Sequence, residues 1–191
     1  MGRWEPGARQ RLVLAAVDLF TEQGYDETTV AQIAERAGVT KSTFFRHFPD
    51  KRELLVAGQE SMCRLLSEGI AEAPDGASPM VAVAAALERA SSMMGPDNRE
   101  LGPRIKAAVA ASTELQERDA LKTVSLAAAM TAALLARGVP EMTAHLAGEL
   151  GVLAFKQGYA RWSESDQSGR GLAEYALAAL DELRTASRSL D

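Results

Sequence analysis

Cysteine, histidine and aromatic residues are scarce in this chain of 191 residues. The single cysteine, Cys63, excludes an intramolecular disulfide and is typical of a reducing compartment, so we expect a cytoplasmic location. With two histidines, His47 and His145, and no Gly-x-Ser-x-Gly motif, a nucleophilic triad has little to build on. No His/Cys cluster has metal-ligand spacing either. The sequence therefore predicts no catalytic site, no metal and no cofactor.

Long hydrophobic runs and signal-like segments are also missing. The first residues, MGRWEPGARQR, contain no apolar core of a secretion signal. The longest weakly charged stretch, LKTVSLAAAMTAALLARG, is rich in alanine and interrupted by Ser125 and Thr131, which favours a buried helix over a membrane span. With 47% hydrophobic and 25% charged residues, the composition is that of a soluble globular protein. We expect no membrane partner.

A general excess of positive charge is absent too, and the net charge of −5 argues at first sight against nucleic acid. The local charge differs. Residues 36–52 hold five basic residues against one acidic residue, Asp50, which gives +4; the basic residues are Arg36, Lys41, Arg46, Lys51 and Arg52. Such a local patch decides whether a surface can approach phosphate groups.

Hydrophobic periodicity predicts helices along almost the whole chain. In RLVLAAVDLFTEQG, apolar residues recur at the spacing of one helix face, and Gly24 marks the end. Proline and glycine in EAPDGASP and MMGPDNRELGP mark breaks. The other expected helices are TTVAQIAERAGV, KSTFFRHF, residues 51–70, VAVAAALERASSMM, and residues 113–137, 140–162 and 172–188. No alternating run is long enough for a strand, so we expect an all-α protein of about nine helices.

Three of the five phenylalanines lie within VTKSTFFRHF, residues 39–48, together with basic residues. Two short helices joined by Gly38–Thr40 have the dimensions of a helix-turn-helix, whose second helix enters the major groove of DNA. Phe44 and Phe48 are four residues apart and would anchor that helix on the core. The residues expected to face base edges or phosphates are Lys41, Ser42, Thr43, Arg46, Lys51, Thr28 and Thr29. On spacing alone, a helical hairpin with a solvated basic face is the alternative.

The segment YDETTVAQIAERAGVTKSTFFRHFPDKREL resembles the DNA-binding segment of TetR-type transcriptional regulators, and the similarity extends over residues 8–56. The resemblance implies a homodimeric regulator, usually a repressor, whose C-terminal helices bind a small ligand that weakens binding to a double-stranded DNA operator. It implies a helix-turn-helix DNA-binding domain in residues 1–55 and a ligand-binding and dimerisation domain in residues 56–191. An architectural or interaction protein that binds DNA without a ligand is the alternative.

The resemblance also implies roles for single residues of the second short helix. Lys41, Ser42 and Thr43 take positions that face bases or lie near them. Phe45 stands where many family members have a tyrosine whose hydroxyl meets a phosphate, so only apolar contact with sugar or a thymine methyl group is open to it. His47 matches a position that touches the DNA backbone, with a packing role as the alternative, and Lys51 matches a phosphate contact.

Two helices carry a candidate dimer interface. The expected helix 140–162 has a stripe of small residues, and the expected helix 172–188 has an apolar face. Two such helices from each chain could form a four-helix interface, as the resemblance also implies, and a dimer would read a palindrome with two recognition helices. Packing of the stripe within one chain is the alternative. The residues are Ala147, Gly151, Ala154, Gly158, Leu172, Tyr175, Ala179 and Leu183.

The effector site is less defined by the sequence. Flexible or aromatic apolar side chains are candidates, although a place in the core is the better explanation for each one taken singly; they are Met62, Met93, Met94, Met130, Phe155, Tyr159 and Trp162. The run from Arg104 to Trp162 resembles the C-terminal domain of a TetR subgroup with an acyl-CoA-like ligand, except that Thr113 replaces a usual proline. That resemblance implies a fatty acyl-CoA effector and cations for its phosphates, for which Arg104, Lys106, Arg118 and Lys122 are candidates, each also explained as a solvated helix charge.

The expected helix over residues 51–70 begins in the DNA-binding domain and ends in the second domain. We therefore expect this helix to transmit effector binding to the recognition helices.

Overall fold

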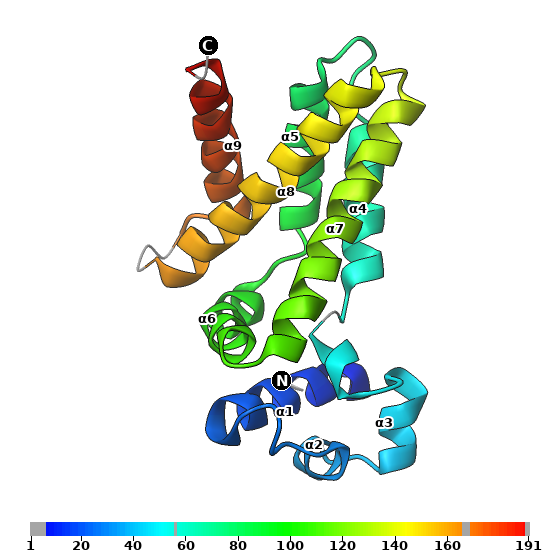
Figure 1. Ribbon diagram of the computed structural model, residues 1–191, viewed down its shortest axis with the longest axis vertical. Coiled ribbons are helices and arrows are strands. Elements are labelled where there is room, and N and C mark those ends of the chain that lie inside the picture. Colours follow the sequence, from blue (N-terminus) through cyan, green and yellow to red (C-terminus); the bar gives the residue numbers. More distant parts are fainter. Residues whose placement is uncertain (1–6, 56, 166–168, 190–191) are drawn as a thin grey trace, which may run out of the picture. The chain divides into compact units, whose positions relative to one another are not determined.

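The computed structural model describes residues 7–55, 57–165 and 169–189, and every regular element in these ranges is helical (Figure 1). This confirms the predicted all-α fold of about nine helices. The elements are α1 (Ala8–Gln23), α2 (Val30–Arg36), α3 (Lys41–His47), the 3-10 helix η1 (Lys51–Leu54), α4 (Gln59–Ala71), α5 (Pro79–Ser91), α6 (Pro96–Ala110), α7 (Thr113–Ala136), α8 (Glu141–Glu164) and α9 (Leu172–Arg188).

The chain forms two compact units, which are not consecutive in sequence. The first unit contains Met1–Ala57 together with Arg104–Leu121, and the second contains Gly58–Pro103 and Lys122–Asp191. In the first unit, side chains of the second segment join the same apolar core as those of the first three helices: Leu12, Ile33 and Phe44 are buried with Ala108 and Leu115. The end of α6 and the first turns of α7 are therefore part of the unit that carries α1–α3.

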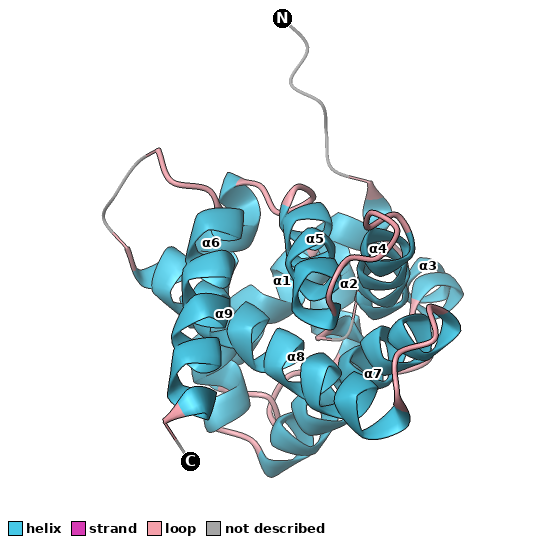
Figure 2. Cartoon of the chain, turned by 90° about the horizontal axis from the view of Figure 1, so that it is seen from above, coloured by secondary structure: helices cyan, strands magenta, loops and turns pink. Residues whose placement is uncertain are grey.

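The second unit is built on close helix contacts that small residues permit. A Cβ atom added to Gly158 of α8 would lie 2.5 Å from the Cα atom of Ala176 in α9, and one added to Gly69 of α4 would lie 2.6 Å from the Cα atom of Ala86 in α5. Backbones can approach this closely only where side chains are absent or very small. The helices α7 and α8 lie side by side in this unit (Figure 2), with Met130 against Gly151.

The helix expected over residues 51–70 is not continuous. Asp50 accepts hydrogen bonds from the backbone amides of Arg52 and Glu53 and starts the short helix η1, which ends at Leu54. Gly58 then adopts φ = 89°, a left-handed conformation that favours glycine, before α4 begins at Gln59. The expectation of one transmitting helix from residue 51 onward is therefore wrong.

Helix α7 is less buried than the sequence indicates. Leu126, Met130 and Leu134 are buried in the core, but only 28% of the most apolar 18 residues of α7 are buried, and Val124 and Leu135 are exposed. Among the described helices, α7 alone has the length and composition of a membrane span, which the core helix of a soluble protein also has. The prediction of a buried helix is thus correct for one face of α7 and wrong for the other.

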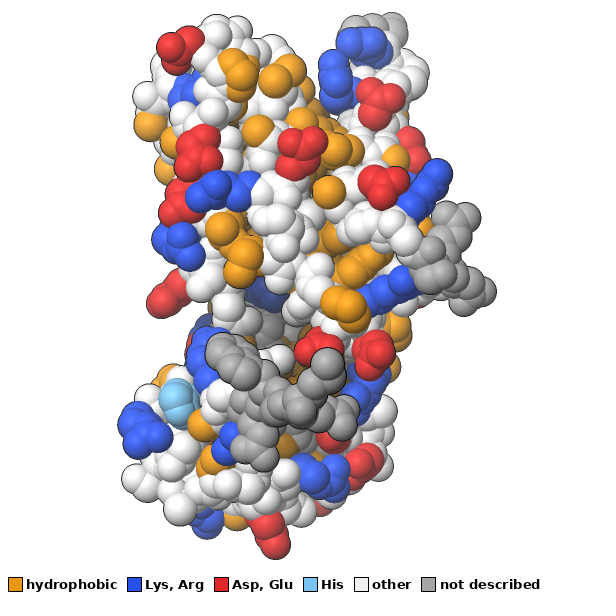
Figure 3. Space-filling model, turned by 180° about the vertical axis from the view of Figure 1, so that it is seen from behind, with side chains coloured by type: hydrophobic (Ala, Val, Ile, Leu, Met, Phe, Trp, Pro, Cys, Tyr) orange, Lys and Arg blue, Asp and Glu red, His pale blue; other side chains and the backbone are white. Residues whose placement is uncertain are grey.

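Charged residues on the second unit form ion pairs with each other. Arg89 of α5 donates to the carboxylates of Glu68 at 2.7 Å and Glu72 at 2.9 Å, both of α4, and Arg64 donates to Glu68 at 2.9 Å. Seen from behind, charged side chains of both signs are interspersed with hydrophobic ones (Figure 3). Pairs of this exposed kind stabilise a fold only weakly.

Candidate nucleic-acid interface

The α2–turn–α3 segment is built from caps at both helix starts. Thr29 accepts from the backbone amide of Gln32, whose side chain in turn accepts from the backbone amide of Thr29 at 2.8 Å, a complete capping box. The turn after α2 is closed by Gly38, with φ = 65°, and by the bond from the Val39 amide to the Ala34 carbonyl at 2.9 Å.

Thr40 continues this arrangement at the start of α3. Its hydroxyl accepts from the backbone amide of Thr43 at 3.1 Å, which leaves the helix N-terminus satisfied by a side chain of the turn. A short helix, a glycine turn and a capped second short helix together form a helix-turn-helix.

Helix α3 has one buried face and one exposed face. Phe44 is fully buried and Phe48 is 2% exposed, as the four-residue spacing predicts. Their rings lie 5.9 Å apart. The opposite face carries Lys41, Ser42, Phe45 and Arg46, all exposed, with the half-buried Thr43 beside them. The packing prediction for Phe44 and Phe48 is confirmed, and the face that remains in solvent is rich in hydrogen-bond donors.

Three of the five cations counted in residues 36–52 are held by groups of the first unit. Arg36 pairs with Glu22 at 2.8 Å, Arg52 pairs with Asp50 at 2.6 Å, and Lys51 donates to backbone carbonyl groups. Lys41 and Arg46 form no ion pair with any residue in the described part of the chain. Within residues 36–52, the cations that no other group of the described chain holds therefore lie on α3. Counting basic residues in the sequence overstates the positive charge that this segment presents to a ligand.

Two predicted DNA contacts have other positions in the structure. Thr28 is 1% exposed and its hydroxyl donates to the carbonyl oxygen of Gly24 at 2.7 Å, because the loop before α2 folds over it. The ammonium group of Lys51 donates to the carbonyl oxygens of Tyr25 at 2.7 Å and Thr28 at 3.0 Å. Both side chains thus have hydrogen-bond partners within the chain, and the phosphate contacts expected for them stay predictions. His47 is half-buried, which leaves both of its predicted roles open.

One cation near α3 was not predicted from the sequence as part of this surface. The guanidinium group of Arg9, an exposed residue of α1, lies 5.1 Å from the ring centroid of Phe48. This is a cation–π distance and it holds a positive charge beside the end of α3. No periodic signal in residues 8–23 distinguishes Arg9 from its exposed neighbours, so only the packing of α1 on α3 shows it.

Comparison with known proteins agrees with this geometry. The family model described as bacterial regulatory proteins, tetR family, matches residues 12–57, which contain α2, the turn and α3. Residues 12–57 are thus similar to this family of regulators. A curated protein that is similar, the HTH-type transcriptional regulator TcmR of Streptomyces glaucescens, is 37% identical over 90 residues, which are 43% of this chain and 40% of TcmR. The chain covers less than half the length of the curated relatives it matches.

Solved TetR-family structures share the fold over nearly the whole chain. A structure described as a TetR-family regulator from Syntrophomonas wolfei has a TM-score of 0.63 and 18% identity, with 94% of each chain covered. The TetR-family repressor FadR of Thermus thermophilus, solved with lauroyl-CoA, has a TM-score of 0.52 and 22% identity, with 91% of each chain covered. At these identities the likeness concerns the fold alone.

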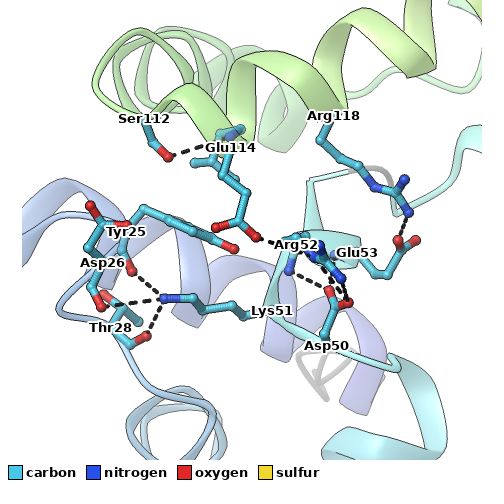
Figure 4. Close-up of polar contacts among 11 residues, drawn as sticks. Tyr25, Asp26, Thr28, Asp50, Lys51, Arg52, Glu53, Ser112, Glu114 and Arg118 are labelled. Atoms are coloured by element: carbon cyan, nitrogen blue, oxygen red, sulfur yellow. Dashed lines mark hydrogen bonds and ion pairs between the residues drawn. The ribbon is translucent and has the colours of Figure 1, made fainter.

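A polar cluster joins η1 to the first turns of α7 within the first unit (Figure 4). Arg52 lies 3.4 Å from Glu114 in addition to its bond with Asp50, and Arg118 pairs with Glu53. The hydrogen bonds from Arg52 lower the pKa of Asp50 below its ordinary value. The cluster contains three acidic and two basic groups, so it binds these elements together and does not attract an anion.

The predicted effector cations are divided between the two units. Arg104, Lys106 and Arg118 belong to the first unit, where Arg104 pairs with Asp18 and Arg118 with Glu53, whereas Lys122 belongs to the second. Ion pairs inside the first unit account for Arg104 and Arg118.

The predicted apolar effector residues all lie in the second unit. Met62, Met130 and Trp162 are buried, Met93 is 67% exposed and Met94 is half-buried. Burial of the first three agrees with the core alternative that the sequence left open. Because Met93 faces solvent, its side chain is not enclosed by other residues.

Three aromatic side chains of α8 form one cluster. The ring of Tyr159 lies 6.3 Å from that of Phe155 and 5.8 Å from that of Trp162. The Tyr159 hydroxyl donates to the carbonyl oxygen of Asn98 in α6 at 2.6 Å, and burial raises the pKa of this phenol. This cluster brings three of the predicted effector residues together, and Met62, Met94, Met130 and Phe155 meet in the apolar core of the second unit.

The predicted dimer stripe lies inside the chain. Ala147, Gly151, Ala154 and Gly158 are all buried, because they face α5, α7 and α9 of the same chain. Leu172 and Ala179 are buried as well, Leu183 packs against the same core, and the Tyr175 hydroxyl lies 2.7 Å from that of Ser165. Packing within the chain, the alternative that the sequence left open, accounts for the buried members, whereas Tyr175 and Leu183 are partly exposed, and the dimer interface stays a prediction.

Proposed function

We propose that this chain is a transcriptional regulator that binds a palindromic DNA operator as a homodimer and leaves it when a small apolar effector binds. The observation that carries the proposal is the donor-rich exposed face of α3, supported from behind by Phe44 and Phe48. A rigid helix with exposed donors at its first turn is what reading base edges in the major groove requires.

The side chains on α3 have separate roles in this proposal. Lys41 and Ser42, at the first turn, meet base edges, and Arg46, one turn later, meets phosphate. Phe45 is 56% exposed and has no polar atom, so it adds apolar contact with a sugar or a thymine methyl group. Thr29 contributes from the start of α2, where it is exposed.

A homodimer is proposed through α7 and α8. The stripe of small residues packs within the chain, and exposed apolar side chains of α7 and α8 offer a surface for a second chain. Val124 and Leu135 lie on one face of α7, and Met142, Leu146 and Leu153 on one face of α8, and all five side chains are between 42% and 80% exposed. Exposed apolar side chains gathered on neighbouring helices mark interaction surfaces. Two recognition helices ~34–36 Å apart would then read the two halves of a palindrome.

For the effector, we propose a fatty acyl thioester. Two facts support this: the resemblance of residues 104–162 to the acyl-CoA-binding subgroup, and the lauroyl-CoA bound to FadR, whose fold is similar. The apolar part of such a ligand suits the aromatic cluster of α8, whereas Arg104 and Arg118 are already paired with carboxylates.

Fluorescence anisotropy tests the function. Labelled duplex DNA from immediately upstream of the coding sequence is titrated with protein, and the complex is then challenged with long-chain acyl-CoA, free fatty acid or CoA alone. We expect tight binding and release by acyl-CoA but not by CoA. If the protein bound this DNA but acyl-CoA did not release it, the acyl thioester would be rejected as effector, and the alternative of a DNA-binding protein without this ligand would be supported. Equal binding to all DNA sequences would contradict the proposal of a specific operator.

A further inference from the structure

Lys51 reaches from the start of η1 back to the loop that precedes α2. Its ammonium nitrogen lies 2.7 Å from the carbonyl oxygen of Tyr25, 3.0 Å from that of Thr28 and 3.5 Å from that of Asp26 (Figure 4). The same nitrogen is 4.0 Å from the centroid of the Tyr25 ring. A lysine ammonium group has three donors, and here three carbonyl oxygens surround it.

This arrangement is a strong internal tie. Hydrogen bonds from a charged donor are shorter and stronger than neutral ones, and a cation over an aromatic face adds further attraction. A DNA phosphate could reach Lys51 only if these bonds were broken and the carbonyl oxygens of Tyr25 and Thr28 lost their charged partner.

The tied loop determines where α2 begins. The Thr28 amide donates to the Tyr25 carbonyl at 3.2 Å, and the Thr28 hydroxyl donates to the Gly24 carbonyl at 2.7 Å. Thr29, the next residue, is the N-cap of α2. Lys51 follows α3 by four residues, so its side chain joins the chain leaving α3 to the chain entering α2.

Tyr25 has two other neighbours within the first unit. Its ring packs edge-on against Phe20 of α1, with centroids 5.1 Å apart, and is 4% exposed. Its hydroxyl lies beside the carboxylate of Glu114 in the first turn of α7 (Figure 4). Burial raises the pKa of the Tyr25 phenol, and the charge of Glu114 raises it further, so the phenol is neutral at physiological pH.

We propose that Lys51 is a positioning residue for DNA binding, which acts through the loop Gly24–Thr28 and the ring of Tyr25 to fix the start of α2 relative to α3, and not a phosphate contact. The proposal rests on the proposed function as a DNA-binding regulator. In this proposal the ammonium group of Lys51 binds carbonyl groups of the protein itself. DNA affinity should then depend on Tyr25, a residue buried away from solvent.

The test measures operator affinity of the full chain at several salt concentrations for Lys51→Met, Tyr25→Leu and Tyr25→Phe. Lys51→Met keeps the aliphatic stem and removes the charge, Tyr25→Leu removes the aromatic face but keeps the lysine, and Tyr25→Phe is the control that keeps the ring. We expect Lys51→Met and Tyr25→Leu each to weaken binding about tenfold, with an unchanged slope of log affinity against log salt. Tyr25→Phe should bind as the wild type does.

Amide hydrogen exchange of the protein without DNA supplies the second readout. The positioning role predicts faster exchange at Thr28 and the first turn of α2 in Lys51→Met, with the core of α1 unchanged. A salt slope reduced by about 0.9 for each lost contact, with unchanged loop exchange, would show a phosphate contact and overturn the proposal. Unchanged affinity in Lys51→Met would overturn it as well. If the wild-type chain bound no DNA specifically, the proposed function would fail, and exchange in the loop would alone decide whether Lys51 holds α2.

Discussion

Phe44 and Phe45 are neighbours in the sequence, and their rings lie 5.3 Å apart at an interplanar angle of 81°, yet one is fully buried and the other is 56% exposed. The pair marks the boundary between the core and the surface of α3. Phe44 secures the helix to α1 and α2, and Phe45 lies among the charged and hydroxyl side chains that we assign to DNA.

Replacing each ring separates these roles. Phe44→Ala should lower the free energy of unfolding by ~3–5 kcal/mol, because it leaves a cavity in the core. Phe45→Ala should change it by less than about 0.5 kcal/mol and still weaken operator binding. Urea denaturation and DNA anisotropy measure the two effects. Equal destabilisation by both substitutions would contradict the two-faced helix.

Lys41 is expected to read a base. Lys41→Ala should weaken binding to the operator by ~1–3 kcal/mol and weaken binding to unrelated DNA much less. The control is Arg188→Ala, which removes an exposed cation from the end of α9 and should leave both affinities unchanged. An equal loss on every DNA sequence would make Lys41 a phosphate contact.

Close packing of α8 on α9 is tested by glycine substitutions. Gly158→Ala should destabilise the chain by roughly 1–3 kcal/mol, because the new methyl group meets the backbone of Ala176. Gly171→Ala is the matched control, since Gly171 has φ = −79° and open space around it. Thermal unfolding measures both. A neutral Gly158→Ala would show that the two helices do not approach this closely.

The proposed dimer face predicts an effect on assembly without an effect on folding. Leu146→Glu on α8 should yield monomers in sedimentation velocity with little change in unfolding, because the side chain is 59% exposed within one chain. Met93→Glu replaces an even more exposed apolar side chain outside this face, and its dimer should persist. A Leu146→Glu dimer as stable as the wild type would place the interface elsewhere.

Asp50 gives the fold a dependence on pH. Because Arg52 lowers the pKa of Asp50 below its ordinary 3.8, the ionised form stabilises the folded state above that pH, and the contribution disappears as pH falls through the lowered pKa. The half-exposed pair contributes at most about 1 kcal/mol. Asp50→Asn keeps a capping group, so its stability deficit at pH 7 should vanish near pH 2. A deficit that is constant with pH would indicate that the charge is irrelevant.

Much of the first unit could be predicted because its signals are local. The capping box of Thr29 and Gln32, the turn glycine Gly38 and the spacing of Phe44 and Phe48 each lie within a few residues, and the structure has all of them. Helix α6 was missed: Gly95 and Pro96 were interpreted with Gly102 as breaks, whereas Pro96 begins a helix and Gly102 allows close approach to Ser163.

What the sequence could not predict are contacts between distant parts of the chain. A stripe of small residues predicts close helix packing, but it does not tell whether the partner helix belongs to the same chain. Gly151 and Gly158 pack against helices of the same chain. Likewise, the positive charge of Lys51 is visible in the sequence, whereas the carbonyl group of Tyr25 that binds it, 26 positions away, is not.

The central claim is that the exposed face of α3 reads a palindromic sequence. The most direct measurement is selection of bound duplexes from a random-sequence library with the wild-type protein, followed by sequencing, with Lys41→Ala selected in parallel. The account predicts an inverted repeat whose half-sites are one helical turn or a multiple of it apart, and altered base preference for Lys41→Ala at one position of each half-site. Enrichment of no sequence, or the same preference with and without Lys41 and with no repeat, would contradict it.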